Sequence, residues 1–464
     1  MGLWNTILMN LPEVAGPTQR RLSFKEKLKW TLTILVIFYV LGMIPLFGIG
    51  RNTLQQFELL SVILGAQFGS LISLGIGPIV TGSIVLQLLN GSGIVKFDLT
   101  THEGKMKFQG VQKLMAIFFT VFEAGIYVFM GGLAPPPALI GTPLHFQLQL
   151  LLIFQLILGG ILILFMDEVV SKWGFGSGVS LFIAAGVSQQ VFIRALSPLP
   201  SPTNPGIATG AIPALFQSLG VGDPITAGLM LAGVLSTIFV FVISVYAQAM
   251  KVEIPLSFGR IRGHGIRWPL SFIYTSNIPV ILVAALLANI QLWARLLQNW
   301  GHPFLGTFVG NSPVSGFVSW VTPPNIVGLI IRSSLTGGDI GRALVYMTVM
   351  IIGAVVFSIF WVQTSGMDAK SQAKQMMSSG LQIPGFRRDE RVLETLLNRY
   401  IWPLTIMGGL AVGFLAGFAD ITGTLSSGTG ILLAVMIVYK LYEEISKQHM
   451  MDMNPMMRKF MGGG

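Results

Sequence analysis

FELLSVILGAQFGSLISLGIGPIVTGSIVLQ, residues 57–87, is the stretch that decides how the rest of the chain must fold. It is apolar enough to enter a bilayer, but several glycines and Pro78 interrupt it near its middle. With a rise of about 1.5 Å per residue, each piece would form a helix of roughly 20–25 Å, shorter than the ~30 Å hydrocarbon core. Broken backbone at that depth is tolerated only where protein or a water-filled cavity surrounds it. We therefore predict a half-inserted plug at about 57–73, followed by a half-helix that begins at Pro78.

The composition is typical of a polytopic membrane protein. Of the 464 residues, 52% are hydrophobic and 10% are charged, whereas soluble domains carry about 25% charged residues. The chain contains no cysteine, which excludes disulfides and thiol chemistry, and its five histidines are too scattered for a histidine-based metal site. We therefore predict no metal and no cofactor. Residues 1–29 lack the pattern of a cleavable signal peptide and form a basic, amphipathic N-terminal segment that we expect at the cytoplasmic interface.

Ten apolar segments predict an all-α membrane protein with ten spans, if the broken segment counts once. The predicted spans are 30–48, 57–90, 111–131, 146–166, 179–196, 226–247, 271–292, 343–363, 401–419 and 426–445. A proline-rich stretch at 197–225 predicts a non-helical hinge linker between an N-terminal half (30–196) and a C-terminal half (226–445). Five spans in each half would place the halves in opposite orientations, as in an inverted repeat. No convincing internal sequence match supports the repeat, and we assign no function to the methionine-rich tail at 446–464.

Lysine and arginine define the predicted sidedness. With the N-terminus inside, 24 of the 29 basic residues fall in inside segments, as the positive-inside rule requires. Both termini are therefore predicted to be cytoplasmic. The outside segment 293–342 is rich in tryptophan and proline, which is typical of an interfacial or re-entrant loop.

Two inside loops, 248–270 and 365–399, are longer and more basic than simple connectors need to be. One interpretation is that they only fix the topology. The other is that they dock a polyanion, because arginine binds phosphate through two parallel hydrogen bonds. The candidate docking residues are Arg260, Arg262, Arg267, Arg387, Arg388 and Arg391. A ribosome pressed against the membrane is the polyanion that suits this scaffold.

Three separated motifs resemble one family. They are GIGPIVTGSIVLQLL at 75–89, GFGSGVSLFIAAG at 174–186 and TSNIPVI at 275–281. They occur in the order found in the SecY family, the central subunit of the protein-conducting channel, and the chain is most similar to its archaeal and eukaryotic-type branch. The resemblance covers essentially the whole chain. It implies a pseudo-symmetric clamshell of two inverted five-helix halves around an hourglass pore that a plug closes from outside.

The resemblance also implies a ring of aliphatic side chains at the waist of the pore. The matching residues are Ile76, Val80, Val179, Ile183, Ile281 and Leu433, and the matching plug residues are Phe57, Leu60, Ile63, Leu64 and Phe68. The spacing of Ile76 with Val80, and of Val179 with Ile183, places each pair on one helix face. Aliphatic pairs at this spacing more often indicate ordinary packing or lipid contact, so the pore ring depends on the resemblance.

A polar cluster is the second candidate site. Glu123 interrupts an apolar span, and an ionisable group at that depth costs a few kcal/mol unless it is paired or hydrated. A hydrogen-bonded packing role is the simpler alternative. In the family, the counterparts of Thr81, Glu123 and Asn289 meet at the lateral gate, the seam between the two halves. We expect this cluster to hold the seam closed with a few weak hydrogen bonds.

Three function classes compete. A passive polypeptide channel suits the apolar waist, because such a waist demands no hydrogen-bond match from its substrate. An ion-coupled secondary transporter also uses broken helices, but Glu123 is almost alone among carboxylates inside the spans. An intramembrane enzyme would need a nucleophile–base pair or paired aspartates, and a motor would need a phosphate-binding loop; we find neither. We therefore predict no enzymatic activity.

The resemblance also implies partners and a location. We expect a small clamp subunit of the SecE or gamma type, a small beta-type subunit, the ribosome, signal sequences, nascent polypeptides and membrane lipids. The complex itself could assemble into oligomers. The expected location is the plasma membrane, which the chain would cross several times.

Overall fold

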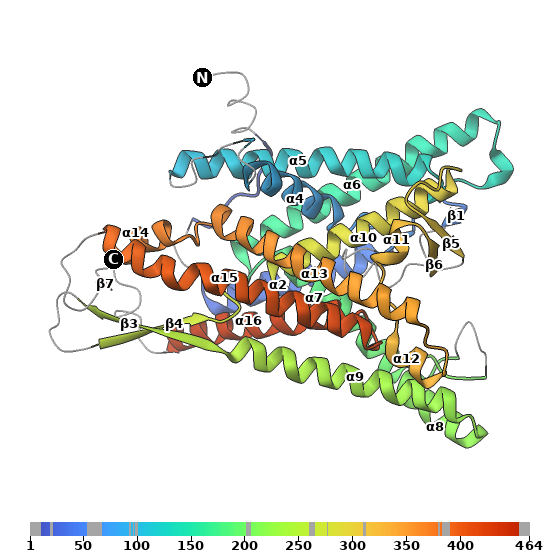
Figure 1. Ribbon diagram of the computed structural model, residues 1–464. Helices are drawn as coiled ribbons and strands as arrows, with labels where there is room; N and C mark the ends of the chain where they lie inside the picture. Colours follow the sequence, from blue (N-terminus) through green and yellow to red (C-terminus); the bar gives the residue numbers. More distant parts are fainter. Residues whose placement is uncertain are drawn as a thin grey trace.

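The computed structural model describes residues 11–18, 22–52, 67–91, 94–95, 97, 101–200, 206–258, 265–275, 277–309, 312–378, 381–382 and 390–453. The chain is mostly helical, and its long helices run side by side (Figure 1), so the predicted all-α fold class is confirmed. A helix lies at each predicted span. These helices are α2 (Phe24–Met43), α4 (Gly77–Gly91), α5 (His102–Phe129), α6 (Pro143–Trp173), α7 (Gly178–Leu196), α9 (Pro224–Ala249), α10 (Ile278–Asn299), α13 (Gly337–Thr364), α15 (Glu390–Ile421) and α16 (Gly428–Met453).

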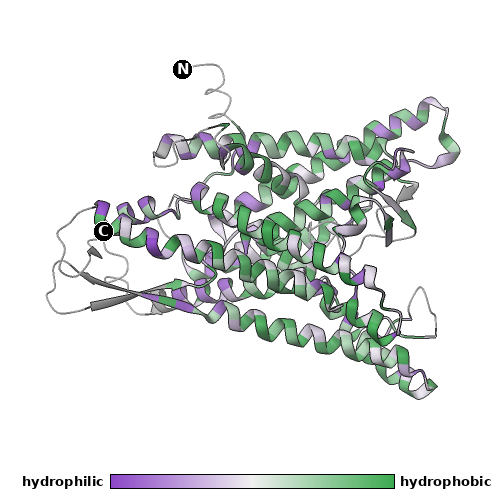
Figure 2. Cartoon of the chain, in the orientation of Figure 1, coloured by the Kyte–Doolittle hydropathy of each residue, from purple (hydrophilic) through white to green (hydrophobic). Residues whose placement is uncertain are grey.

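The apolar character lies in the middle of these helices (Figure 2). Among the described residues, seven helices are long and apolar enough to cross a membrane. Helix α4 is apolar but shorter, while α2 carries several charged residues near its start and α16 near its end. The count of ten crossings therefore stays a prediction.

Several helices extend beyond the predicted spans. Helix α5 begins at His102 and α15 at Glu390, each about three turns before the predicted start of its span. The added turns carry charged residues, which leave the lipid while the backbone remains helical. Hydropathy thus marks where a helix meets lipid and not where the helix ends.

Two predicted boundaries were wrong. The linker at 197–225 contains helix α8 (Ala211–Val221), because Pro213 occupies the first turn, where a missing N–H breaks no hydrogen bond. The span predicted to begin at 271 begins at Ile278 instead. Strand β4 (Gly265–Ser271) and the turn after it are as apolar as a helix end, and Pro279 marks the true start.

Short strands were not predicted. Strands β1 (Arg51–Asn52) and β2 (Leu133–Ala134) pair at one end of the molecule. The segment after α10 holds β5 (Thr307–Val309), β6 (Ser312–Ser315), α11 (Phe317–Trp320) and α12 (Ile326–Ile331). At the opposite end, β3 (Lys251–Phe258) pairs with β4 and with β7 (Leu381–Gln382), which follows α14 (Ala369–Ser378). This sheet joins the two basic loops and extends past the helices (Figure 1).

Helix α10 lies at the centre of the helix bundle. In its most apolar window, 72% of the residues are buried, against 17% for α9. Because the surroundings of a membrane protein are apolar, an outer helix such as α9 can present its apolar side chains to lipid. The residues that matter for a central site are therefore expected on α10 and on the helices that pack against it.

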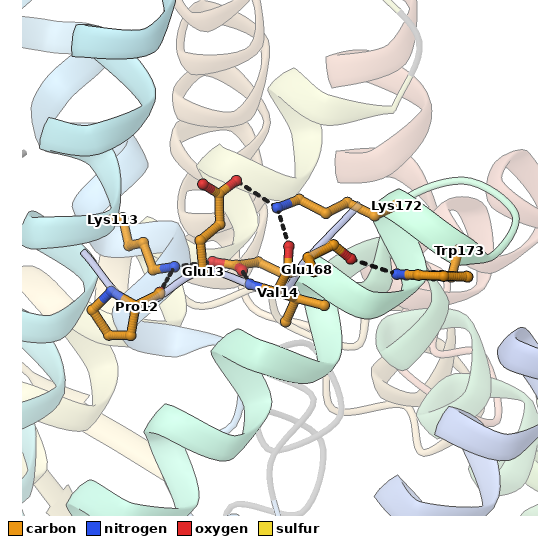
Figure 3. A network of polar contacts seen from close by, with 8 residues as sticks. Pro12, Glu13, Val14, Lys113, Glu168, Lys172 and Trp173 are labelled. Atoms are coloured by element: carbon orange, nitrogen blue, oxygen red, sulfur yellow. Dashed lines mark hydrogen bonds and ion pairs between the residues drawn. The ribbon is translucent and has the colours of Figure 1, made fainter. Parts of the chain in front are cut away.

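Residues 12–15, which we call the N-terminal strap, lie across α5 and the end of α6 (Figure 3). The Lys113 ammonium on α5 donates to the Glu168 carboxylate on α6 and to the carbonyl of Pro12. The same carboxylate accepts a hydrogen bond from the backbone N–H of Val14 at 2.9 Å. Glu168 thus ties the strap to both helices.

The last turn of α6 makes further contacts with the strap. Lys172 donates to the Glu13 carboxylate and, at 2.6 Å, to the carbonyl of Val14. The Trp173 indole N–H donates to the carbonyl of Ala15 at 2.9 Å. The hydrogen bond from Lys172 holds the pKa of Glu13 below its usual range. This pair is therefore complete at neutral pH and is lost only as the pH falls through the lowered pKa.

We expect Glu168→Gln to loosen the N-terminal strap. The change removes a charge that accepts two hydrogen bonds at a site where the side chain is only 18% exposed, and such bonds are worth about 1.5–3 kcal/mol each. Limited proteolysis of the N-terminal segment should become several-fold faster. The matched control is Glu103→Gln, which breaks an exposed pair with Lys107 and should have little effect. Equal cleavage of the two variants would contradict a structural role for the strap.

Candidate pore constriction and gate

Residues 67–76 form an irregular, largely buried segment before α4. The backbone N–H of Leu46 donates to the carbonyl of Gly69 at 2.9 Å, and the N–H of Leu71 donates to the carbonyl of Ile44 at 2.9 Å. The Ser73 hydroxyl accepts from the N–H of Gly69 at 2.9 Å. Broken backbone is thus surrounded by protein at this depth, as the sequence requires.

Helix α4 begins at Gly77, one residue before the predicted start at Pro78. Gly75 enters the helix with a φ of 55°, which disfavours residues that carry a Cβ. Of the predicted plug residues, Phe57, Leu60, Ile63 and Leu64 lie outside the described residues. Phe68 is described; it is half-buried and packs against the main apolar cluster.

Two adjacent glycines, which sequence reasoning missed, let α6 pack closely, Gly159 against the irregular segment and Gly160 against α5. A Cβ on Gly159 would lie 1.8 Å from the carbonyl oxygen of Leu71, and a Cβ on Gly160 would lie 2.5 Å from Cγ2 of Thr120. The pair Gly159-Gly160 in the middle of a predicted span was the available signal, because adjacent small residues let backbones approach closely.

The six predicted ring residues come from four places in the chain and meet in one apolar cluster. Ile76, Val80, Ile183, Ile281 and Leu433 are at most 4% exposed, while Val179 is half-buried and packs against the same cluster. The cluster also includes many residues outside the ring. Burial alone therefore does not separate a closed pore from an ordinary core.

Two cavities lie at opposite ends of the helices, with the apolar cluster between them. One cavity is lined by Gly176, Ser177, Ser180, Leu181, Asn277, Ile278, Ile437, Lys440, Leu441 and Glu444. The other cavity is lined by Gly42, Met43, Pro45, Ile49, Gly50, Gln67, Phe68, Gly69 and Ser70. Polar and apolar residues line both cavities, whereas the cluster between them consists of apolar side chains.

Thr81, Glu123 and Asn289 lie in direct contact, although 208 positions separate Thr81 from Asn289. The Asn289 amide on α10 donates to the Thr81 hydroxyl on α4 at 3.0 Å. That hydroxyl lies 3.1 Å from Oε1 of Glu123 on α5 and 2.8 Å from the carbonyl of Gly77. Since a hydroxyl carries one proton, Thr81 can donate to only one of these two acceptors at a time.

The polar cluster is incompletely satisfied. Oε2 of Glu123 and Oδ1 of Asn289 are buried and have no hydrogen-bond partner among the residues that the structure describes. Each such atom costs about 1–3 kcal/mol relative to its hydrated state. Separation of α4 from α10 would let water reach both atoms. The contact therefore holds the helices together less strongly than its hydrogen bonds alone suggest.

Two of the six candidate docking residues lie among the described residues, at the end of the molecule that carries β3, β4 and β7. Arg260, Arg262, Arg387 and Arg388 fall outside the described residues. Arg267 belongs to β4, opposite Pro255 of β3. Arg391 lies in the first turn of α15 and is exposed. The structure thus brings Arg267 and Arg391 to one end, and says nothing of the other four.

Comparison with known proteins matches this architecture to one family over most of the chain. The SecY family description matches residues 70–442. The chain belongs to the SecY family. The resemblance carried by the three motifs is therefore confirmed.

Curated SecY-family relatives match along nearly their whole length. The protein translocase subunit SecY of Methanothermobacter thermautotrophicus is 48% identical over 456 residues, which is 97% of each chain. That of Methanocaldococcus jannaschii is 43% identical and covers 98% of each chain. Both relatives are named as protein translocase subunits.

Solved structures of the SecY family match in three dimensions. A protein-conducting channel aligns with a TM-score of 0.81 and 44% identity, covering 96% of this chain and 97% of that one. A second match, in which the plug domain of SecY stabilises the closed state of the translocation channel, has the same scores. Sec61 of the canine ribosome–channel complex aligns with a TM-score of 0.79 and 42% identity, covering 96% and 97%.

Proposed function

We propose that this chain is the central, pore-forming subunit of a protein-conducting channel. The observation that carries the proposal is the waist, at which aliphatic side chains from α4, α7, α10 and α16 meet between two cavities. A narrow apolar constriction offers nothing to replace the hydration shell of an ion, and it gates by dewetting. It also places no hydrogen-bond demand on a passing polypeptide. These properties suit a substrate with arbitrary side chains.

The lateral gate is proposed at the seam where α4 packs against α10 and α13. Thr81 and Asn289 bridge this seam, and Glu123 supports Thr81 from α5. Hydrogen bonds between membrane helices average about 0.6 kcal/mol and reach about 2. A hydrophobic signal sequence can compete with contacts of that strength, separate the helices and leave sideways into lipid.

We expect Asn289→Leu to shift the hydrophobicity threshold that a signal sequence must reach. The change removes the bond that crosses the seam, worth about 0.6–2 kcal/mol, and an unsatisfied buried oxygen, which costs about 1–3 kcal/mol. These two effects oppose each other, so the closed seam gains about 1 kcal/mol and the threshold should rise. Translocation of reporters with graded signal hydrophobicity measures the threshold. Thr348→Val is the matched control, because the exposed Thr348 hydroxyl donates within its own helix, to the carbonyl of Leu344. An unchanged threshold in Asn289→Leu would contradict the proposal that the Thr81–Asn289 contact holds the seam closed.

The energy for transport is proposed to come from outside the chain, from a translating ribosome or another partner. Strands β3 and β4 of the first basic loop extend beyond the helices at one end (Figure 1), and β3 joins the two loops through its pairing with β7. We place this end and both termini in the cytoplasm and the protein in the plasma membrane. A small clamp subunit of the SecE or gamma type and a small beta-type subunit complete the proposed complex.

Charge reversal at the basic end should weaken ribosome binding. We compare Arg391→Glu, at this end, with Arg332→Glu, an exposed arginine in the segment after α12 at the opposite end. Loss of a phosphate contact lowers affinity and makes the dependence on salt shallower, by about one unit of slope for each contact. Sedimentation with ribosomes at several salt concentrations measures both quantities. If the two variants bind ribosomes equally well, the basic loops do not dock the ribosome and serve only to fix the topology.

Translocation into vesicles tests the function as a whole. Vesicles that contain this chain with its native partners receive ribosomes that carry a secretory chain. The proposal predicts that the secretory chain becomes protected from protease. If it stays accessible while the vesicles accumulate a small solute with an ion gradient, the chain is a secondary transporter.

A further inference from the structure

Two aspartates make the same contact in different halves of the chain. Asp167 lies near the end of α6, and its Oδ1 accepts the backbone N–H of Val179, in the first turn of α7, at 2.9 Å. Asp420 lies at the end of α15, and its Oδ1 accepts the backbone N–H of Thr429, in the first turn of α16, at 2.7 Å. In each half, the end of one helix thus carries the carboxylate that caps the start of the next.

A glycine makes each contact possible. A Cβ on Gly178 would lie 2.6 Å from Cα of Asp167, and a Cβ on Gly428 would lie 2.4 Å from the backbone nitrogen of Asp420. Real Cβ atoms do not approach so closely, so each aspartate-bearing helix end lies directly against a helix start that has no side chain. Each cap therefore fixes a helix against its neighbour, not only its own first turn.

The sequences around the two glycines match. SGVSLFIA at 177–184 and SGTGILLA at 427–434 share Ser-Gly at the start, aliphatic or aromatic side chains in the second turn and alanine at the end. This is the internal match that sequence reasoning did not find. Ile183 follows Gly178 by five residues, as Leu433 follows Gly428, which is about 7.5 Å along a helix.

The two capped helices run antiparallel and pack against each other. A Cβ on Gly176 would lie 3.3 Å from Cδ2 of Leu441, and a Cβ on Gly430 would lie 3.2 Å from Cγ2 of Val187. As the residue numbers rise along α7, the numbers of the facing residues on α16 therefore fall. On this register Ile183 lies opposite residues 433–434. The caps sit at opposite ends of the pair, and each ring residue lies the same number of residues from its own cap.

We propose that Asp167 and Asp420 are equivalent positioning residues, each of which fixes the depth of one pore-lining helix so that Ile183 and Leu433 meet at the same level. The inference rests on the proposed function, because a shared depth of Ile183 and Leu433 matters only if the two side chains close a pore. A ring closes only if its members share one depth, and a slip of one helix turn would move a member by about 5.4 Å. Anchoring α7 and α16 from opposite ends sets the two depths independently.

Asp223 provides an internal comparison. It caps α9 by accepting the N–H groups of Ile225 and Thr226 at 3.2 Å. This aspartate directly precedes its own helix, so the cap is local, and α9 carries none of the ring residues. Loss of this cap weakens a helix start without changing the ring.

Cysteine pairs test the proposal, because the native chain has no cysteine. Ile183→Cys is paired with Ala434→Cys or, one turn away, with Ile437→Cys, and disulfide formation is measured in membranes with the assembled complex. We expect the 434 pair to dominate. Asp167→Ala and Asp420→Ala should lower the ratio of the 434 to the 437 crosslink about fivefold or more. Asp420→Asn keeps an acceptor oxygen and should restore the ratio, and Asp223→Ala should leave it unchanged.

A second variant covers the case in which the alanine variants do not fold. Asp420→Glu keeps the charge but lengthens the side chain by one methylene, so it should displace α16 and lower the same ratio. An unchanged ratio in Asp167→Ala and Asp420→Ala, or in Asp420→Glu where these do not fold, would overturn the proposal. A change equal to that of Asp223→Ala would also overturn it. The crosslinks report helix depth whether or not a nascent chain touches the ring, so they are read independently of the proposed function.

Discussion

Replacing Ile76, Ile183 and Leu433 with serine together is expected to raise the ion conductance of the closed channel about a hundredfold. All three side chains are fully buried in the apolar waist. Each new hydroxyl stabilises water there by about 1 kcal/mol. Three of them add about 3 kcal/mol, or about two orders of magnitude in the population of a wetted pore. Planar-bilayer recordings of the purified complex measure the conductance.

The control for the serine variant uses the same chemistry on the outside of the bundle. Leu231, Leu235 and Ile238 on α9 are about half exposed, so the triple serine variant at these positions places hydroxyls toward lipid. It should leave the conductance unchanged. Equal conductance in both triple variants would show that the constriction lies elsewhere.

The second large effect is expected from Gly159→Ala. The added Cβ would lie 1.8 Å from the carbonyl oxygen of Leu71, which is fixed by the hydrogen bond from the Leu71 N–H to Ile44. Helix α6 must therefore separate from residues 67–76 by more than 1 Å. Overpacking of this kind costs about 1–3 kcal/mol and occasionally more. We expect a lower midpoint of thermal unfolding. The fraction of Gly159→Ala protein that folds should show an ion leak past the displaced segment.

Gly125→Ala is the matched control for Gly159→Ala. Among the described residues, no atom outside the neighbouring backbone of its own helix lies within 4 Å of the position where its Cβ would stand, and alanine is favoured over glycine in a helix by about 0.5–1 kcal/mol. Its thermal midpoint in detergent should stay the same or rise. If Gly159→Ala behaves like this control, the close packing of α6 against residues 67–76 is not required for the fold.

The sequence predicted those features that depend on local chemistry. The interruption around Gly75 and Pro78 predicted a short helix behind broken backbone, and α4 begins one residue before Pro78. Apolar runs located a helix at every predicted span. Predicted helix boundaries were wrong where hydropathy and backbone conformation do not change at the same residue. Charged turns extend α5 and α15, and an apolar strand precedes α10.

The site depends on contacts that no local pattern encodes. The Asn289–Thr81 bond joins residues 208 positions apart, and only the family resemblance indicated that they meet. The clash that makes Gly159 necessary involves a backbone oxygen 88 positions away in the chain, at Leu71. In the sequence, Asp167 and Asp420 are simply acidic residues that directly follow two predicted spans. Their caps became visible once the helix starts they contact were placed in space.

Crosslinking of an arrested secretory chain tests the central claim most directly. Photoreactive side chains are placed at residues 76, 80, 183, 281 and 433, with a lipid-facing position on α9, such as 238, as the control. The account predicts adducts with the nascent chain from the five waist positions and none from 238. Absence of adducts from all five positions, while the same chain still crosses the membrane, would contradict it.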